Sequence, residues 1–308
     1  MSLPKILCIV GPTASGKTSL GLLLAKRFDG EIVSADARQL YKDFSIGTGK
    51  PECESEYHHD EHICWVDDVP HYLMDSQDPR EPISVAEYKA LAEERIEDIL
   101  SRNKLPIIVG GTGLYISALI DQPLLPEVPP NEELRKELEQ KDLPELVHEL
   151  LELDEDAGNS IDLQNPRRII RAIELIKALD LPINEIRKNG DPKYDALQLA
   201  LKHEPEVLRN RIDTTIERFF HDGWLQEVRD LLTKDIPLDV PAWSSIGYPE
   251  LRQVLEGQLT ENEAKTAIQL ATWHYAKRQL TWFKRDQRIK WLESDQEALT
   301  EAIRFLRT

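Results

Sequence analysis

The residues best suited to chemistry are Gly11-Pro12-Thr13-Ala14-Ser15-Gly16-Lys17-Thr18, which match the pattern G-x-x-x-x-G-K-[ST]. In such a loop successive backbone N–H groups point at phosphate oxygens, the lysine adds a full positive charge, and the Thr18 hydroxyl suits Mg²⁺. The context supports the match, because an apolar run (6–10) precedes the loop and a helix (18–27) is expected to follow it. The sequence therefore predicts a phosphate-binding site; the competing interpretation is a chance match in an ordinary turn.

A carboxylate follows the second predicted strand, in Ser34-Ala35-Asp36-Ala37-Arg38-Gln39. Open α/β sheets bind their ligands at the carboxyl ends of parallel strands. An acid at that edge, beside a phosphate site, is suited to be a general base or a Mg²⁺ ligand. Asp36 is therefore a candidate catalytic residue, and an aspartate that only caps a turn is the alternative.

A glycine-rich turn, Gly110-Gly111-Thr112-Gly113, follows the third predicted strand in the same way. Glycines there allow the backbone to approach a ligand closely, and Thr112 offers a hydroxyl. A merely tight turn is the competing interpretation. The loop 46–51 also combines small residues with a lysine, but it carries little information alone.

Cysteines and histidines gather in one segment: Cys53, His58, His59, His62, Cys64 and His71. Their spacing matches no usual zinc pattern and the neighbourhood is acidic, so a solvated loop is favoured over a structural metal site. The chain has three cysteines, Cys8 being the third, and we expect them to form no disulfide framework. A reducing, cytoplasmic setting is the default for such a sequence.

The charge of the 308-residue chain is strongly acidic, with a formal net value of -18, which argues against a broadly basic nucleic-acid binder. Basic residues nevertheless cluster over 277–290 and at Arg167, Arg168 and Arg171. Such local patches can bind a polyanion in a salt-sensitive way. No run of 18 apolar residues and no signal-peptide pattern is present, so we expect no membrane association.

The elements that must position these residues alternate between strand and helix over the first 120 residues. Strands are predicted at 5–10, 31–34 and 106–109, and more weakly at 71–73, with a helix at 84–102 opened by a capping box. This alternation predicts an α/β fold of the P-loop NTPase type, a parallel sheet flanked by helices. Residues 123–193 are expected to form a helical insertion domain, with 1–122 and 194–308 as the catalytic core.

After the insertion, a returning strand is predicted at 195–202, followed by helices that end with a long one from Thr260 to about Phe283. That last helix mixes aromatic and basic residues. Because a helix of this length must bury one face, most of its aromatics are assigned to the core. Its basic residues are left on the other face, where they can meet nucleic-acid phosphates.

Taken together, these motifs resemble the tRNA dimethylallyltransferase family (tRNA isopentenylpyrophosphate transferases) of bacterial type. The resemblance spans nearly the whole chain, and the order of its motifs makes it specific. Besides the phosphate loop, the matching segments are Asp36-Ala37-Arg38-Gln39-Leu40-Tyr41-Lys42, Ile46-Gly47-Thr48-Gly49-Lys50-Pro51, His71-Tyr72-Leu73-Met74-Asp75, Asp78-Pro79, Gly110-Gly111-Thr112-Gly113-Leu114-Tyr115, Asn165-Pro166-Arg167-Arg168, Ile246-Gly247-Tyr248 and Tyr275-Ala276-Lys277-Arg278-Gln279-Leu280-Thr281-Trp282-Phe283.

The resemblance implies an enzyme that moves a dimethylallyl group from dimethylallyl diphosphate to N6 of the adenosine just 3′ of the anticodon, in tRNAs that read U-starting codons. It implies Asp36, Thr18 and Arg211 as catalytic residues: the base, a Mg²⁺ ligand and a pyrophosphate-holding arginine. The implied tRNA contacts are Asp36, Ala37, Arg38, Gln39, Thr112, Arg167, Arg168, Arg171, Lys277, Arg278 and Gln279. It further implies Mg²⁺ as cofactor, the anticodon stem-loop as partner, and a cytoplasmic monomer.

The chain departs from the family pattern in places. Ala37 stands where the family usually has serine, Thr215 where an arginine is frequent, and Thr272-Trp273 where a Thr-Arg pair is common. The segment 53–69 is longer and more acidic than expected. These departures bear on RNA affinity and on the phosphate ligands more than on the type of reaction.

Three other functions fit part of the sequence. A small-molecule P-loop kinase would use Arg167, Arg168 and Arg171 as lid arginines, but it leaves the basic, aromatic final helix unexplained. An adenylate prenyltransferase acting on AMP or ATP would need neither the insertion nor that helix. A non-catalytic RNA-binding module with a vestigial phosphate loop is opposed by the intact set of Lys17, Thr18 and Asp36.

Overall fold

The structure, a computed structural model, describes residues 2–58, 61–124 and 128–307. It divides into two compact units, Met1–Ile120 with Lys193–Thr308, and Asp121–Pro192. Within the described residues, every helix is too short or too polar to cross a membrane.

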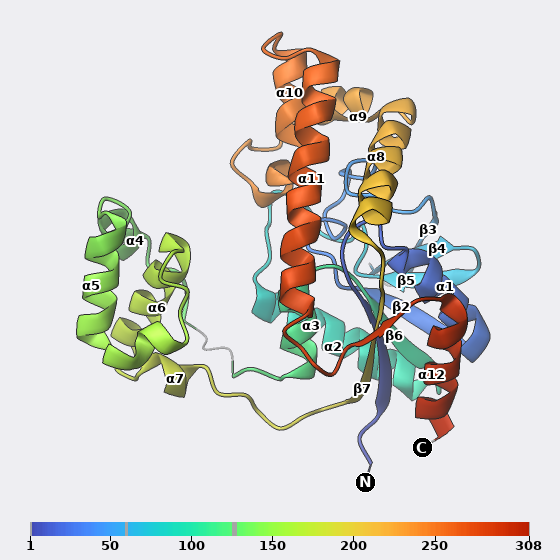
Figure 1. The fold of residues 1–308 in the computed structure, drawn as a ribbon, viewed down its shortest axis with the longest axis horizontal. Helices are drawn as coiled ribbons and strands as arrows, with labels where there is room; N and C mark the ends of the chain where they lie inside the picture. Colours follow the sequence, from blue (N-terminus) through green and yellow to red (C-terminus); the bar gives the residue numbers. More distant parts are fainter. Residues whose placement is uncertain (1, 59–60, 125–127, 308) are drawn as a thin grey trace. The chain divides into compact units, whose positions relative to one another are not determined.

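One mixed sheet organises the larger unit, in the order β3-β4-β5-β2-β6-β1-β7-β8 (Figure 1). Strands β1, β2, β5, β6, β7 and β8 are parallel neighbours, whereas β3 and β4 form an antiparallel hairpin at one edge. The strands span β1 (Lys5–Val10), β2 (Gly30–Ser34), β3 (Glu54–His58), β4 (Glu61–Val66), β5 (Val69–Tyr72), β6 (Leu105–Val109), β7 (Asp195–Leu201) and β8 (Lys290–Leu292).

Helices cover both faces of this sheet because successive side chains of a strand point to opposite faces. From β1, Ile6 and Cys8 lie in the core shared with α2 (Val85–Ser101) and α3 (Gly113–Ile120). Leu7 and Ile9 lie in the core on the other face, with α1 (Lys17–Phe28) and α12 (Asp295–Arg307). The predicted α/β fold with a parallel sheet between helices is therefore confirmed.

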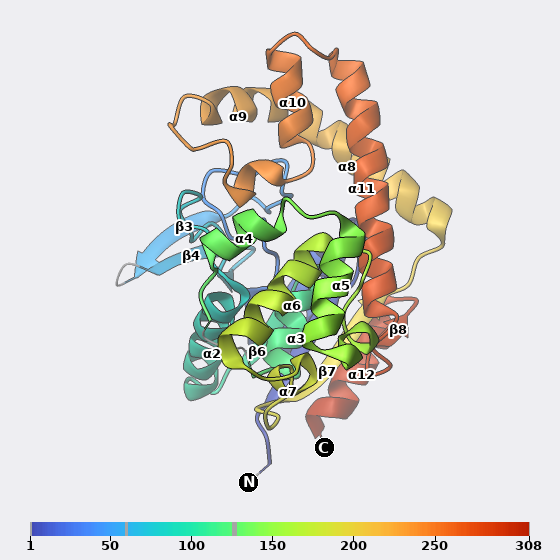
Figure 2. The ribbon, with the colours of Figure 1, turned by 90° about the vertical axis from the view of Figure 1, so that its left-hand side faces the viewer.

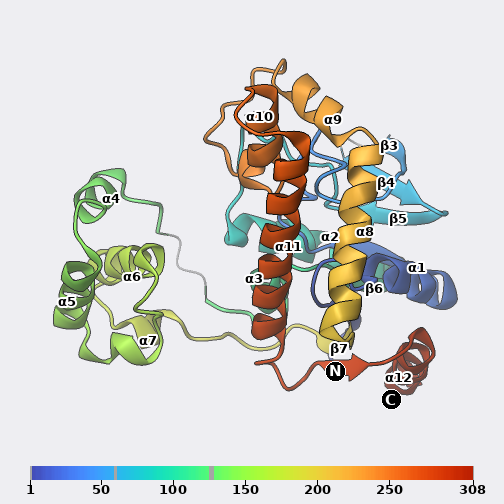
Figure 3. The same cartoon turned by 45° about the horizontal axis from the view of Figure 1, so that its top comes forward.

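A layer of helices continues the larger unit beyond the carboxyl ends of the strands. It consists of α8 (Pro205–His221), α9 (Trp224–Leu231), a 3₁₀ turn (Pro241–Ser244), α10 (Tyr248–Leu255) and α11 (Glu261–Phe283). Helices α8 and α11 lie side by side around a core of their own (Figure 3). The predicted capping box of the long helix is present, because Thr260 accepts from the Glu263 N–H and Glu263 accepts from the Thr260 N–H.

Two glycines of the matching motifs, one in the loop 46–51 and one in the helical layer, pack against the same tryptophan. A Cβ on Gly47 or on Gly247 would lie 2.2 or 2.0 Å from the buried indole of Trp224, so only glycine fits at either position. Glu227 adds polar contacts, since its carboxylate accepts from the N–H groups of Ser45 and Ile46. Gly47 thus serves the packing between the loop and the helices, and Gly247 serves the packing of α9 against the start of α10.

The smaller unit is helical and has a separate core. Its helices are α4 (Glu132–Leu138), α5 (Leu143–Leu153), a 3₁₀ turn (Glu155–Asn159), α6 (Pro166–Leu179) and α7 (Ile183–Ile186). As predicted, α6 begins at Pro166, and the Asn165 side chain caps it by accepting from the Arg168 N–H. The two ends of the unit are joined by backbone hydrogen bonds, from Gly190 N–H to the Gln122 carbonyl and from Leu124 N–H to the Lys188 carbonyl.

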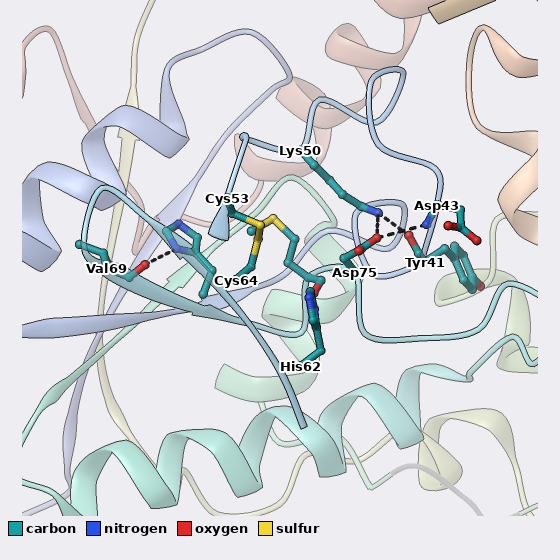
Figure 4. Close-up of a disulfide and its surroundings, with 10 residues drawn as sticks. Tyr41, Asp43, Lys50, Cys53, His62, Cys64, Val69 and Asp75 are labelled. Atoms are coloured by element: carbon teal, nitrogen blue, oxygen red, sulfur yellow. Dashed lines mark hydrogen bonds and ion pairs between the residues drawn. A yellow bond between two sulfur atoms is a disulfide. The ribbon is translucent and has the colours of Figure 1, made fainter. Parts of the chain in front are cut away.

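The segment 53–69 corrects two predictions. It forms the β3–β4 hairpin instead of a solvated loop (Figure 2), and a disulfide joins Cys53 to Cys64 (Figure 4). The prediction that the cysteines form no disulfide is wrong. The pairing of β3 with β4 sets Cys64 opposite Ser55, and Cys53 is two residues before Ser55. The acidic composition of the segment gave no sign of this pairing. Among the described residues no group of three His, Cys, Asp or Glu side chains is placed to hold a metal ion; His59 lies outside them.

We expect reduction of this disulfide to lower the free energy of unfolding by about 2 to 3 kcal/mol, because a cross-link between residues separated by 11 positions restricts the unfolded chain. Urea unfolding followed by circular dichroism, with and without dithiothreitol, measures the difference. The variant with both Cys53→Ser and Cys64→Ser should not respond to the reductant. Identical midpoints for the native chain in both buffers would contradict the expectation.

Candidate functional site

The phosphate loop joins the central strand β1 to helix α1, and its backbone adopts conformations that favour glycine. Gly11 has a φ of 132° and Gly16 a φ of 94°, and Ala14 also has a positive φ, of 59°. Gly16 caps α1 without a side-chain hydrogen bond. The loop is therefore shaped by its own sequence, and the amides at the start of α1 are left open for an anion.

The amides of the loop divide into used and open groups. The Thr13 N–H donates to Oε1 of Gln279 at 2.8 Å, Pro12 has no N–H, and Ser15 N–H makes a long contact of 3.4 Å with the Pro12 carbonyl. The remaining N–H groups of the loop make no hydrogen bond within the described chain; they belong to Gly11, Ala14, Gly16, Lys17 and Thr18. Five amides, three of them consecutive at the start of α1, are thus open for phosphate oxygens.

Lys17 lies over the loop, with Nζ donating to the Pro12 carbonyl at 2.6 Å. Burial of the ammonium lowers the pKa of Lys17 to about 8, and the nearby carboxylate of Asp36 opposes this shift. The two predicted residues therefore lie close enough for their charges to interact. A cation that is poorly hydrated in this way gains from an arriving phosphate.

Asp36 lies in a turn directly after β2, where the predicted strand end places it. Its Oδ1 accepts from the N–H groups of Arg38 at 2.9 Å and Gln39 at 3.4 Å, so hydrogen bonds from the described residues reach only one carboxylate oxygen. The Ala37 N–H donates to Oγ1 of Thr112 at 3.0 Å, which joins this turn to the glycine-rich turn. The carboxylate is held in place and keeps one oxygen free.

Two tyrosines, the buried Tyr115 and the half-buried Tyr275, interact with the charge of Asp36. Burial, the neighbouring Tyr41 and the Asp36 carboxylate raise the pKa of Tyr115 to about 12, and burial with the same carboxylate raises the pKa of Tyr275. Both phenols thus keep their protons at neutral pH. Neither phenol is therefore suited to act as a base at that pH.

The glycine-rich turn 110–113 permits close contacts at three positions. A Cβ would lie 2.1 Å from the Ala35 carbonyl oxygen at Gly110, 2.3 Å from the Gln279 side chain at Gly111 and 2.1 Å from the Trp282 indole at Gly113. These approaches bring the carboxyl ends of β1, β2 and β6 together with α11. All three contacts are with protein groups, as the tight-turn interpretation requires. The turn nevertheless lies at the edge of the site, so it is also compatible with the ligand interpretation.

Gln279, which the resemblance implies as a tRNA contact, lies between the phosphate loop and the glycine-rich turn. Its side chain is buried, Oε1 accepts from Thr13 and Nε2 donates to the Gly111 carbonyl at 2.9 Å. Both ends of the amide are engaged within the protein, which favours a role inside the phosphate site. Gln39, also predicted at the RNA, donates from its side chain to the carbonyls of Thr48 and Gly49.

The structure brings Arg211 of α8 to the phosphate loop, since a Cβ on Gly16 would lie 3.4 Å from its Nη2. His203, between β7 and α8, lies beside it and contacts the Ser15 carbonyl oxygen at 2.8 Å. Sequence reasoning missed His203. The rule that singled out Asp36, a polar residue just past the carboxyl end of a parallel strand, also applies to His203.

The predicted cationic contacts are partly engaged elsewhere. The Arg38 guanidinium donates to the Pro241 carbonyl and to the Ser244 hydroxyl, whereas Lys277 and Arg278 are exposed on α11, over the rings of Trp273 and Tyr275 respectively. In the smaller unit, Arg167 is exposed, Arg168 pairs with Asp162, and Arg171 contacts Glu174 and the Val128 carbonyl. Exposed Lys277, Arg278 and Arg167 are the best placed to meet a polyanion.

Comparison with known proteins now decides the family. A model of the IPP transferase family matches residues 39–286, and a model described as isopentenyl transferase matches residues 4–69. The chain belongs to the IPP transferase family.

Relatives and solved structures agree with this assignment. A tRNA dimethylallyltransferase of Roseiflexus castenholzii is 41% identical over 294 residues, which cover 94% of this transferase and 93% of the relative. The crystal structure of the tRNA isopentenylpyrophosphate transferase of Bacillus halodurans matches with a TM-score of 0.70 at 35% identity, covering 98% of this chain and 95% of that one. A eukaryotic dimethylallyltransferase described as acting on tRNA matches with a TM-score of 0.74 at 26% identity, over 91% and 69% of the two chains.

We expect the affinity of this transferase for inorganic pyrophosphate to fall as the pH rises through 8. The protonated form of Lys17 attracts the anion, and its lowered pKa of about 8 makes that form scarce above this pH, so the loss approaches about tenfold per pH unit. Calorimetric titration with Mg²⁺ and pyrophosphate between pH 6.5 and 9.5 measures it. Lys17→Met serves as the control, because the titration of pyrophosphate itself affects both proteins equally. The same pH dependence of the affinity in both proteins would contradict the expectation.

Proposed function

We propose that this chain transfers the dimethylallyl group of dimethylallyl diphosphate to N6 of the adenosine on the 3′ side of the anticodon, in tRNAs that read codons beginning with U. The observation that carries the proposal is the meeting of Lys17, Arg211 and Asp36 around one phosphate loop. Two of these are cations suited to a leaving diphosphate, and the third is an anion suited to an incoming amine. Membership in the IPP transferase family supports the same reaction.

The diphosphate side of the reaction is electrostatic. As the bond between the allylic carbon and oxygen breaks, negative charge grows on the departing pyrophosphate. The open amides of Gly16, Lys17 and Thr18, the Lys17 ammonium and the Arg211 guanidinium are hydrogen-bond donors in fixed positions, so they stabilise that charge as it forms. The remaining residues of the loop, from Gly11 to Ser15, hold these donors in place.

Magnesium fits this site only in company with the substrate. The described residues offer no cluster of three acidic, histidine or cysteine ligands, whereas Mg²⁺ typically takes one or two protein oxygens with waters and phosphate oxygens. In our proposal the Thr18 hydroxyl, in the first turn of α1, is the protein ligand. The ion, when bound, neutralises part of the diphosphate charge.

The acceptor side relies on Asp36. An adenine amino group is a poor nucleophile, and it must lose a proton when it forms the new N–C bond. The oxygen of Asp36 that receives no hydrogen bond from the described residues is free to take that proton, while the other oxygen fixes the turn. The acceptor base must leave the stack of the anticodon loop, which costs less in a loop than in a duplex.

The RNA contacts are proposed for the exposed cations and for the turns around Asp36. Lys277 and Arg278 on α11 suit phosphates near the target base, with Ala37, Arg38 and Thr112 closer to Asp36. The helical unit Asp121–Pro192 offers Arg167 for the anticodon stem, while Arg168 and Arg171 must first exchange acidic partners. In our proposal the enzyme acts as a monomer, and a tRNA substrate supports a cytoplasmic location.

An assay with radiolabelled dimethylallyl diphosphate, Mg²⁺ and unmodified tRNA tests the function directly, with AMP and ATP as acceptors in parallel. We expect the label in tRNA and none in the nucleotides. Label in AMP or ATP would support an adenylate prenyltransferase instead. Transfer of phosphate from ATP without any prenyl transfer would favour a kinase.

Asp36→Asn is expected to lower the turnover number by about two to four orders of magnitude, the usual contribution of a general base. Asparagine keeps the oxygen that accepts from Arg38 and Gln39, so the turn and the affinity for the donor should stay within twofold. Single-turnover kinetics and donor titrations measure the two effects. Unchanged turnover removes Asp36 from the base role, and a changed Mg²⁺ requirement instead assigns it to the metal.

A further inference from the structure

His203 contacts the phosphate loop from outside the loop's own sequence. It lies half-buried between β7 and α8, and its Nε2 is 2.8 Å from the carbonyl oxygen of Ser15, 188 residues earlier. A carbonyl oxygen only accepts hydrogen bonds, so Nε2 must carry a proton. The neutral ring protonated at Nε2 and the charged ring both satisfy this requirement.

This hydrogen bond also fixes the direction of the N–H group of the same peptide, which belongs to Gly16. The Ser15 carbonyl and the Gly16 N–H belong to one planar peptide group and point in opposite directions when it is trans. Gly16 has a φ of 94°, and glycine lets this plane rotate with little resistance. Holding the Ser15 oxygen against His203 therefore directs the Gly16 N–H away from His203, and within the described chain that N–H has no partner.

The imidazole also lies next to the arginine of the site. Nη1 of Arg211 is 3.4 Å from the same Nε2 of His203. Because Nε2 already donates its proton to Ser15, it does not accept one from the guanidinium, and the contact is only van der Waals packing. The imidazole edge thus sets the spacing between Arg211 and the loop while the guanidinium donors stay available.

We propose that His203 is a positioning residue for the diphosphate: it fixes the peptide between Ser15 and Gly16 so that the Gly16 N–H points to the anion beside Arg211. The inference rests on the proposed function and deepens it, since it concerns the same diphosphate site. The described contacts of His203 are with Ser15 and Arg211 and not with Asp36. Its effect should therefore fall on donor binding and spare the proton transfer.

The test compares His203→Ala with His203→Gln, whose terminal amide N–H can reach the Ser15 carbonyl. Loss of one hydrogen bond of typical net strength corresponds to about fivefold in affinity. We expect His203→Ala to raise the KM for dimethylallyl diphosphate and the Kd for pyrophosphate by at least that factor, with kcat within twofold. His203→Gln should restore both, and His221→Ala, at the exposed far end of α8, should change neither.

Several outcomes would overturn the inference. A wild-type Kd in His203→Ala shows that the hydrogen bond does not position the loop. An equal loss in His203→Gln shows that the ring only fills space. If His203→Ala does not fold, His203→Asn, which is too short to reach Ser15, replaces it. Because pyrophosphate binding is measured without tRNA, an absent prenyl transfer in the native enzyme refutes the proposed function and leaves this test standing.

Discussion

The amide of Gln279 is the interaction on which the geometry of the site depends. From the long helix α11 it accepts from Thr13 in the phosphate loop and donates to Gly111 in the glycine-rich turn. The bond to Gly111 is buried and the bond from Thr13 is partly buried, and a buried backbone group left unsatisfied would cost about 1 to 3 kcal/mol. One side chain thus fixes two loops of the sheet to each other and to the helix that carries the exposed cations.

The other contacts of the site follow the same pattern, in which a distant element restrains the backbone of a loop. Thr112 accepts from the turn of Asp36, and Gln39 donates to the loop 46–51, which packs against Trp224 of the helical layer through Gly47. The carboxylate and the ammonium therefore sit in positions set by packing. Preorganisation of this kind is what electrostatic stabilisation of a developing charge requires.

Local sequence signals were enough for much of the fold. The strand, loop and helix around Lys17, the capping box at Thr260 and the cap at Asn165 were all readable because each depends on neighbours within a few residues. The hairpin β3–β4 was not readable, because its glutamates resemble those of a solvated loop. The disulfide could not be predicted without the strand pairing, because that pairing brings the two cysteines together.

In the candidate site, too, contacts between residues far apart in the sequence could not be predicted. Position at a strand end singled out Asp36, but nothing local distinguishes a glutamine that holds a loop from one that meets RNA. The partner of Gln279 lies 266 residues away and that of His203 lies 188 residues away. Such roles arise from the tertiary fold, so a motif reveals that these residues are present without revealing what they touch.

Residues near the two ends of the smaller unit are hydrogen-bonded to each other, Gln122 with Gly190 and Leu124 with Lys188. A segment whose ends meet can be gained, lost or exchanged without cutting any strand of the sheet. The helical unit is therefore an insertion that can be replaced as a whole. Its sequence can thus change while the phosphate loop and the carboxylate of the larger unit stay as they are.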